Sequence, residues 1–165
     1  MLDRIQANPR AARLLADVFD FDLERTDHVE PARPSWDGEF LPIAGDASGG
    51  TFYLCGGPVL YASSEGQAGV LAADPTAAIE LIIGVPTWHD VVSAAPDLDA
   101  MRAAFEATHP ELGPDIDQHQ AEVRAELGLG PVPVDELLVR LRASVTELSP
   151  EYRLLNEEGD EYEQL

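Results

Sequence analysis

The stretch PIAGDASGGTFYLCGG, residues Pro42–Gly57, gives the strongest indication of how this chain folds. Ser48 stands among glycines, which is compatible with a nucleophile in a glycine-rich elbow, and the glycines are compatible with a phosphate cradle. The run Thr51–Cys55 is rich in the β-branched and aromatic residues that favour strands. The glycine pair before it supplies backbone angles that other residues resist. The stretch therefore predicts a turn between two strands, with Asp46 hydrogen-bonded to backbone N–H groups of the turn.

Further short apolar or aromatic runs lie around this turn, separated by glycines or polar residues. Such short connections are typical of antiparallel hairpins, because parallel strands need long crossovers. Cys55, the single cysteine of the chain, lies in one of these runs and is expected to be a buried apolar residue. The predicted strands are Phe40–Gly45, Thr51–Cys55, Pro58–Ser63 and Ala68–Ala73.

Helical patterns flank this β-rich part. Asn8 and Asp74, each followed by proline, predict capped helix starts, and Thr87 with Asp90 has the spacing of a capping box. The charged segment 22–39 predicts an ordered loop or a short edge strand. The predicted helices are 8–21, 74–84, 86–95, 97–109, 115–130 and 134–148.

These elements predict an α+β fold, in which a mainly antiparallel sheet of about four to six short strands packs against flanking helices. The chain length suits a single domain over residues 1–150. The remaining residues, 151–165, form an acidic tail whose charge favours a flexible or loosely docked segment.

The charge balance narrows the choice of partner. The chain has 165 residues with 31 acids, 10 bases and no lysine, which gives a net charge of −21. Such a surface repels nucleic acid and anionic membranes and attracts a basic protein partner, although plain solubility is the simpler explanation of acidity. No apolar run reaches the roughly 18 residues of a membrane span, and the N-terminus lacks the apolar core of a secretory signal. We therefore expect a soluble, cytoplasmic protein.

No catalytic or ligand-binding pattern is complete. The order around Ser48 departs from the G-x-S-x-G elbow of hydrolases, and none of the four histidines has a spacing that singles it out as a base. A Walker loop needs lysine, and a dinucleotide loop opens a helix, whereas these glycines lead into a strand. Asp115 and His119 share a predicted helix face, for which a solvated surface is the simpler interpretation than a metal site. The sequence predicts no enzyme activity, no cofactor and no metal.

The segment from Phe40 to about Val92 resembles the SUKH superfamily, the Smi/Knr-like group of bacterial immunity proteins and fungal cell-wall assembly regulators. The resemblance covers about a third of the chain and rests on the order of its elements. An FLPI strand is followed by a turn with an acid and a glycine pair, an aromatic strand, a Val–Tyr strand, an acid and an apolar helix. The residues that carry it are Phe40, Leu41, Pro42, Ile43, Asp46, Gly49, Gly50, Phe52, Tyr53, Val59, Tyr61 and Glu65. The Trp-rich signature common early in the family is reduced to Trp36, and ASSEGQ replaces an acidic and aromatic run.

The resemblance implies a non-enzymatic binding module, and for bacterial relatives the neutralisation of a toxin, often a nuclease or deaminase, by direct binding. A housekeeping regulatory or scaffold domain without a toxin partner is the alternative, and a small hydrolase that uses Ser48 and His89 is a further one. Exposed features near the predicted turns indicate a protein-binding face, although a structural or solvated role is the simpler interpretation of its acids and tryptophan. The candidate residues of this face are Trp36, Asp46, Ser48, Glu65 and Gln67.

Overall fold

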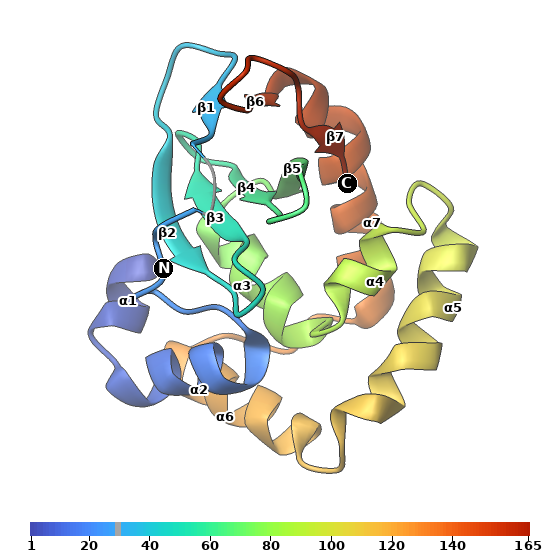
Figure 1. The fold of residues 1–165 in the computed structure, drawn as a ribbon. Coiled ribbons are helices and arrows are strands. Elements are labelled where there is room, and N and C mark those ends of the chain that lie inside the picture. Colours follow the sequence, from blue (N-terminus) through green and yellow to red (C-terminus); the bar gives the residue numbers. More distant parts are fainter. Residues whose placement is uncertain (29–30) are drawn as a thin grey trace.

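The computed structural model describes residues 1–28 and 31–165 and has the predicted α+β architecture (Figure 1). Four consecutive strands form an antiparallel meander, and a fifth strand from the end of the chain pairs in parallel with the last of them, giving the order β2-β3-β4-β5-β7. All four predicted strands are confirmed to within one or two residues. The strands of this sheet are β2 Leu41–Gly45, β3 Thr51–Leu54, β4 Val59–Ala62, β5 Gln67–Ala72 and β7 Glu163–Gln164.

A second, two-stranded sheet joins distant parts of the chain. Strand β1, Arg33–Pro34, lies in the segment for which a loop or short edge strand is predicted, and residues 29–30 of that segment lie outside the described residues. It pairs antiparallel with β6, Leu154–Leu155. The charge of the acidic tail favours a flexible segment, but the tail contributes one strand to each sheet. Within the tail, Arg153 forms an ion pair with Glu161 at 2.6 Å.

The helices follow the predicted pattern with one addition at the N-terminus, α1. The predicted caps are confirmed where aspartate or asparagine precedes proline: Asn8 accepts from the amides of Arg10 and Ala11, and Asp74 accepts from those of Thr76 and Ala77. The last helix passes into a π-helical turn, η2, and a 3₁₀ turn, η3. The bounds are α1 Leu2–Gln6, α2 Pro9–Phe19, α3 Pro75–Gly84, α4 Trp88–Val92, α5 Leu98–Thr108, η1 His109–Leu112, α6 Ile116–Leu127, α7 Val134–Ala143, η2 Ser144–Leu148 and η3 Ser149–Glu151.

The capping box expected at Thr87 and Asp90 is absent from α4. The Thr87 side chain makes no cap hydrogen bond; its hydroxyl oxygen accepts instead from the Thr108 hydroxyl at 2.8 Å. This contact links the start of α4 to the end of α5. The prediction was wrong because a tertiary partner 21 residues away takes the hydroxyl that the local pattern assigned to the helix.

The two faces of the sheet carry cores of different size. Alternate strand residues point in opposite directions, so Phe52 and Tyr61 enter the larger core together with residues of the helices, such as Trp88. Their neighbours Tyr53 and Leu60 enter a smaller cluster on the other face. That cluster is bounded by the β1–β6 ribbon and is extended by half-buried aromatic residues. Cys55 is buried in it, as predicted.

The FLPI residues, Phe40–Ile43, lie in and just before β2, the strand at one edge of the sheet. Phe40 stacks on Tyr53 with ring centroids 4.1 Å apart, and Ile43 is buried. Leu41 is 50% exposed, and Pro42 lies beside it on the edge strand β2, where a residue without an N–H donor is tolerated. Val59 is fully buried in the larger core.

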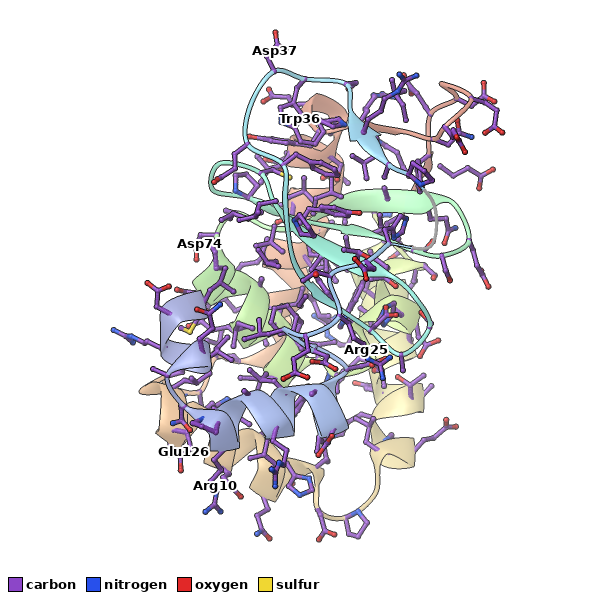
Figure 2. The ribbon with its side chains drawn as sticks, turned by 60° about the vertical axis from the view of Figure 1, so that its left-hand side comes forward. Arg10, Arg25, Trp36, Asp37, Asp74 and Glu126 are labelled. Atoms are coloured by element: carbon purple, nitrogen blue, oxygen red, sulfur yellow. The ribbon has the colours of Figure 1, made fainter. Side chains whose placement is uncertain are left out.

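Polar contacts fasten the N-terminal helices to α6 at the opposite end of the molecule from Trp36 (Figure 2). Arg10 forms ion pairs with Glu122 and Glu126, and the Asn8 side-chain amide donates to Glu126 at 2.8 Å. No helix in the described ranges is both long and apolar enough to cross a bilayer.

Candidate functional site

The DASGG segment forms the predicted turn between β2 and β3, and Asp46 holds it together. One carboxylate oxygen, Oδ1, accepts from the backbone N–H groups of Ser48 at 2.9 Å and Gly50 at 2.8 Å. The same oxygen accepts from the Ser48 hydroxyl at 2.7 Å. The backbone N–H of Asp46 donates to the Gly50 carbonyl at 3.0 Å, which closes the turn. The interpretation of this stretch as a turn pinned by its aspartate is confirmed.

Both glycines of the turn are required by its geometry. Gly49 has a φ of +92°, which side-chain-bearing residues rarely adopt. Gly50 is needed for space, because a Cβ at this position would lie 2.1 Å from the Tyr61 hydroxyl and 2.6 Å from Asp46 Oδ2. The absence of a side chain therefore lets the tyrosine hydroxyl reach the carboxylate.

The second oxygen of Asp46 faces two side chains from other elements. Oδ2 accepts from the Tyr61 hydroxyl at 2.5 Å and lies 3.7 Å from His89 Nε2. Asp46 is only 2% exposed, and this burial by itself raises the pKa of the carboxyl group. The nearby His89 imidazole and the hydrogen bonds from Tyr61, Ser48 and the Gly50 amide outweigh burial and hold that pKa well below its usual range. Asp46 is therefore a buried, ionised carboxylate that depends on its neighbours.

The same contact affects Tyr61 in the opposite sense. Burial raises the pKa of the Tyr61 hydroxyl, and its hydrogen bond to the Asp46 carboxylate raises it further. The phenol therefore stays protonated and serves as a donor. Tyr61 cannot act as a phenolate nucleophile in this environment, so its role is to hold the carboxylate in place.

His89 lies between the buried network and solvent. It stands in the first turn of α4, and its ring stacks on Trp88 with centroids 3.5 Å apart and an interplanar angle of 28°. Its other neighbour is the Tyr61 ring, in an edge-on contact at 5.2 Å. The side chain is 42% exposed. One side of the imidazole thus faces the Asp46 carboxylate while the rest remains reachable from outside.

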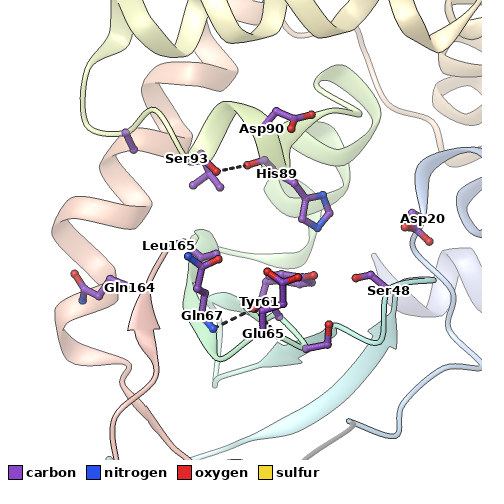
Figure 3. Close-up of a pocket in the computed structure, with 14 residues that line it drawn as sticks. Asp20, Ser48, Tyr61, Glu65, Gln67, His89, Asp90, Ser93, Gln164 and Leu165 are labelled. Atoms are coloured by element: carbon purple, nitrogen blue, oxygen red, sulfur yellow. Dashed lines mark hydrogen bonds between the residues drawn. The ribbon is translucent and has the colours of Figure 1, made fainter.

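Ser48, Tyr61 and His89 line a hollow of about 690 Å³, which we call the polar cleft (Figure 3). In Figure 3 the His89 ring points from α4 towards Tyr61, with Ser48 and Asp20 on one side and Gln67 on the other. At the β4–β5 turn, Ser63 Oγ accepts from the backbone amides of Glu65 and Gln67, which fixes that wall. The lining residues are Asp20, Ser48, Tyr61, Ser63, Ser64, Glu65, Gln67, His89, Asp90, Val92, Ser93, Ala95, Gln164 and Leu165.

Most of the residues predicted for a binding face are gathered at the polar cleft. Ser48, Glu65 and Gln67 line it, and Asp46 lies directly beneath it. Trp36 is not among the lining residues. It is half-buried and packs edge-on against Phe40 and Tyr152, with ring centroids 5.8 and 5.1 Å away. Trp36 therefore belongs to the smaller aromatic cluster on the other face of the sheet.

Several cleft residues had no signal in the sequence that connected them with the turn. Asp20 ends α2 in a left-handed conformation with φ +54°, and its carboxylate accepts from the Ala47 amide at 2.7 Å. Asp90 follows His89 on α4, and Gln164 comes from the tail strand β7. A non-glycine residue at a helix end, such as Asp20, gives no local hint of the loop that it will contact.

The polar cleft combines hydroxyl, amide and imidazole groups with an excess of carboxylates. Asp20, Glu65 and Asp90 contribute three carboxylates to its wall, and none of its lining residues is arginine. The Ser48 hydroxyl donates to Asp46, and no contact among the described residues joins it to an imidazole nitrogen. Away from the cleft, burial raises the pKa of the Cys55 thiol to about 12, which leaves it protonated near neutral pH. The site is suited to receiving cationic, donor-rich groups.

Within residues 1–28 and 31–165, no cluster of three or more histidine, cysteine or acidic side chains is arranged to hold a metal ion. Comparison with protein-family models, curated proteins and solved structures gives no match for this chain. The resemblance to the SUKH superfamily therefore stays a prediction from the sequence.

Proposed function

We propose that this chain is a non-enzymatic protein-binding module of the immunity type, which neutralises a basic toxin domain by direct binding. The observation that carries the proposal is the polar cleft, whose wall presents Asp20, Glu65 and Asp90 without a compensating arginine. The net charge of −21 supports it, because a strongly acidic surface accelerates and orients encounter with a basic partner. The SUKH-like segment, which includes the turn at the cleft, supports it from the sequence.

A nuclease domain is the kind of toxin that this chemistry fits best. Nucleases bind a polyanion and therefore present arginine and lysine side chains along the substrate groove. An acidic module that covers such a groove blocks the substrate without any chemical step. The interaction takes place in the cytoplasm on this proposal, where the toxin would meet its nucleic acid.

Partner capture followed by charge removal tests the proposal. The tagged chain is used to recover proteins from its own cells at low and at high salt, and we expect a basic domain that is retained more strongly at low salt. Asp20→Asn, Glu65→Gln and Asp90→Asn are then combined in one variant, which should weaken binding of the recovered partner at least tenfold.

The matched control removes the same charge elsewhere. Asp17→Asn, Asp37→Asn and Glu106→Gln alter three exposed acids that do not line the polar cleft. This control should weaken binding only slightly, through the reduced long-range attraction. Equal losses in the two triple variants, or recovery of no partner at either salt, would overturn the proposal; a housekeeping scaffold remains the alternative if the partner has no toxic activity.

The hydrolase alternative is supported by one observation, the meeting of Ser48, Asp46 and His89 at the same cleft. It requires the serine hydroxyl to leave Asp46 and to donate to the imidazole before it can attack a substrate. If the chain is a hydrolase, Ser48→Ala and His89→Ala each abolish turnover of generic ester substrates while the protein stays folded. Binding without turnover in the unmodified chain favours the immunity-type function.

A further inference from the structure

A second hollow, of about 280 Å³, opens near the other end of β5, and we call it the apolar cavity. Strand β5, helices α3 and α7 and the π-helical turn η2 supply its walls. Its surface is mostly hydrocarbon. The lining residues are Leu71, Ala72, Ala73, Ala77, Leu81, Leu137, Arg140, Leu141, Ala143, Ser144, Glu147 and Leu148.

The apolar cavity reaches into the core of the protein. Leu71, Leu81 and Leu141 on its walls are each no more than 3% exposed. Several other lining residues are alanines, which leave space between these larger side chains. The π-helical turn Ser144–Leu148 forms one border, and such turns are rare and concentrated at functional sites.

Ser144 places one polar group in this apolar wall. The residue is only 5% exposed and is one of the residues that line the cavity. Its backbone carbonyl accepts from the Ser149 hydroxyl at 3.4 Å. A mostly apolar hollow with one hydroxyl-bearing side chain on its wall is the usual pattern of a small-molecule site.

The rim of the apolar cavity selects against anions. Arg140 is the one cation of the lining, and its guanidinium is already paired with Glu80, at 2.8 Å, and with Glu136. Glu147 adds a third, exposed carboxylate. Three carboxylates around one satisfied guanidinium leave the entrance negatively charged. A ligand with a carboxylate or phosphate head would be repelled there.

We propose that the apolar cavity binds a small uncharged aliphatic alcohol, with its chain among the leucines and its hydroxyl paired with Ser144. The volume corresponds to roughly nine heavy atoms at the ~30 Å³ that a water molecule occupies in the liquid. Alcohols of six to eight carbons match that size. The hydroxyl head supplies both a donor and an acceptor to the serine, and it carries no charge to oppose the acidic rim.

Titration of the whole chain with 1-hexanol, followed by the methyl signals of its leucines in NMR spectra, tests this proposal. We expect saturable shifts at Leu71, Leu81 and Leu141, with a Kd on the order of 1 mM for a ligand of this size. Hexanoate should bind at least tenfold more weakly. Ser144→Ala should weaken 1-hexanol about fivefold, as expected for loss of one hydrogen bond, and should leave cyclohexane binding unchanged.

A filling variant and its control complete the experiment. Ala143→Leu places a larger side chain at the wall and should abolish 1-hexanol binding while the protein remains folded. Ala107→Leu makes the same change on α5 at an exposed position away from the cavity, and it should leave binding intact. Absence of saturable shifts, equal affinity for hexanoate, or continued binding by Ala143→Leu would overturn the proposal. None of these results bears on the polar cleft, because the two sites share no residue.

Discussion

The polar cleft and the apolar cavity lie near opposite ends of the same strand, and they are built on different principles. Gln67 at the start of β5 lines the polar cleft, whereas Leu71 near its end lines the apolar cavity. Around the cleft, directed hydrogen bonds converge on one carboxylate, so each neighbour has a fixed place. Around the cavity, non-directional packing of leucines and alanines leaves room for adjustment. We therefore expect substitutions at the cleft to be costly and those at the cavity to be tolerated.

The largest effect is expected from Asp46→Ala. This change removes the acceptor of four hydrogen bonds and leaves the Tyr61 hydroxyl and the Gly50 amide buried without a partner. We expect the free energy of unfolding to fall by about 4 kcal/mol, measured by urea denaturation followed through the fluorescence of buried Trp88. Asp46→Asn keeps an acceptor oxygen and should lose about 2 kcal/mol. Equal losses in the two variants would show that hydrogen bonding at this position contributes nothing beyond charge.

The next prediction compares two glycines directly. Gly50→Ala places a Cβ against the Tyr61 hydroxyl and the Asp46 carboxylate, and we expect a loss of about 3 kcal/mol. Gly84→Ala on α3 meets the end of the Leu137 side chain at 2.2 Å, an equally close approach. Leu137 lines the apolar cavity, and the end of its flexible side chain can move into that space to relieve the contact. Gly84→Ala should therefore change the free energy of unfolding by about 1 kcal/mol or less.

The measurement for both glycine variants is the midpoint of urea unfolding at pH 7. The double variant Gly50→Ala/Tyr61→Phe serves as the control at the cleft, since it removes the hydroxyl that the new Cβ would meet. It should recover part of the loss. A Gly84→Ala variant as unstable as Gly50→Ala would contradict the difference between the two regions.

Acid should destabilise the folded chain by an amount that depends on Asp46. The pKa of this carboxyl lies below its usual range in the folded state, so the unfolded aspartate, with a pKa near 3.9, binds a proton first. The stabilisation is complete well above that value and decreases as the pH falls. Between pH 6 and pH 3 we expect the unmodified chain to lose about 1 kcal/mol more than Asp46→Asn, whose side chain does not titrate. Parallel losses in urea unfolding at the two pH values would contradict this assignment.

The smallest effect concerns two exposed ion pairs whose residues line neither hollow. Arg102 on α5 pairs with Asp99 and with Asp135, at 3.0 and 2.9 Å, and these side chains are largely in solvent. Arg102→Ala should cost about 0.5 kcal/mol or less, and the cost should disappear in 1 M salt. A loss as large as that of Gly50→Ala would mean that directed polar contacts stabilise this chain wherever they occur.

The sequence was informative where the chemistry is local. The acid and glycine pair of the DASGG turn, and the caps at Asn8 and Asp74, each involve partners within four residues, so residue type alone predicts them. The alternation along β3 and β4 likewise places Phe52 and Tyr61 on one face. Local rules therefore accounted for the meander and for most helix starts.

The contacts that complete the polar cleft were beyond such rules. Asp46 and His89 are 43 positions apart, and the Asp20 carboxylate reaches an amide 27 positions away. The same limitation explains the error at Thr87, whose partner lies on another helix. The strand pairing of the tail could not be predicted from its acidic composition. Its partners are distant in the sequence: Leu154 pairs with Pro34, and Gln164 pairs with Ala68.

The parallel pairing of β7 with β5 has a consequence for the growing polypeptide. As the ribosome releases the chain from its N-terminus, residues 67–72 emerge long before residues 163–164, so the outer edge of β5 waits without its partner. An exposed strand edge offers free N–H and C=O groups to any neighbouring chain. We expect nascent chains truncated before residue 150 to associate with one another through this edge. We expect the association to stop once the acidic tail has been synthesised and β7 has paired with β5.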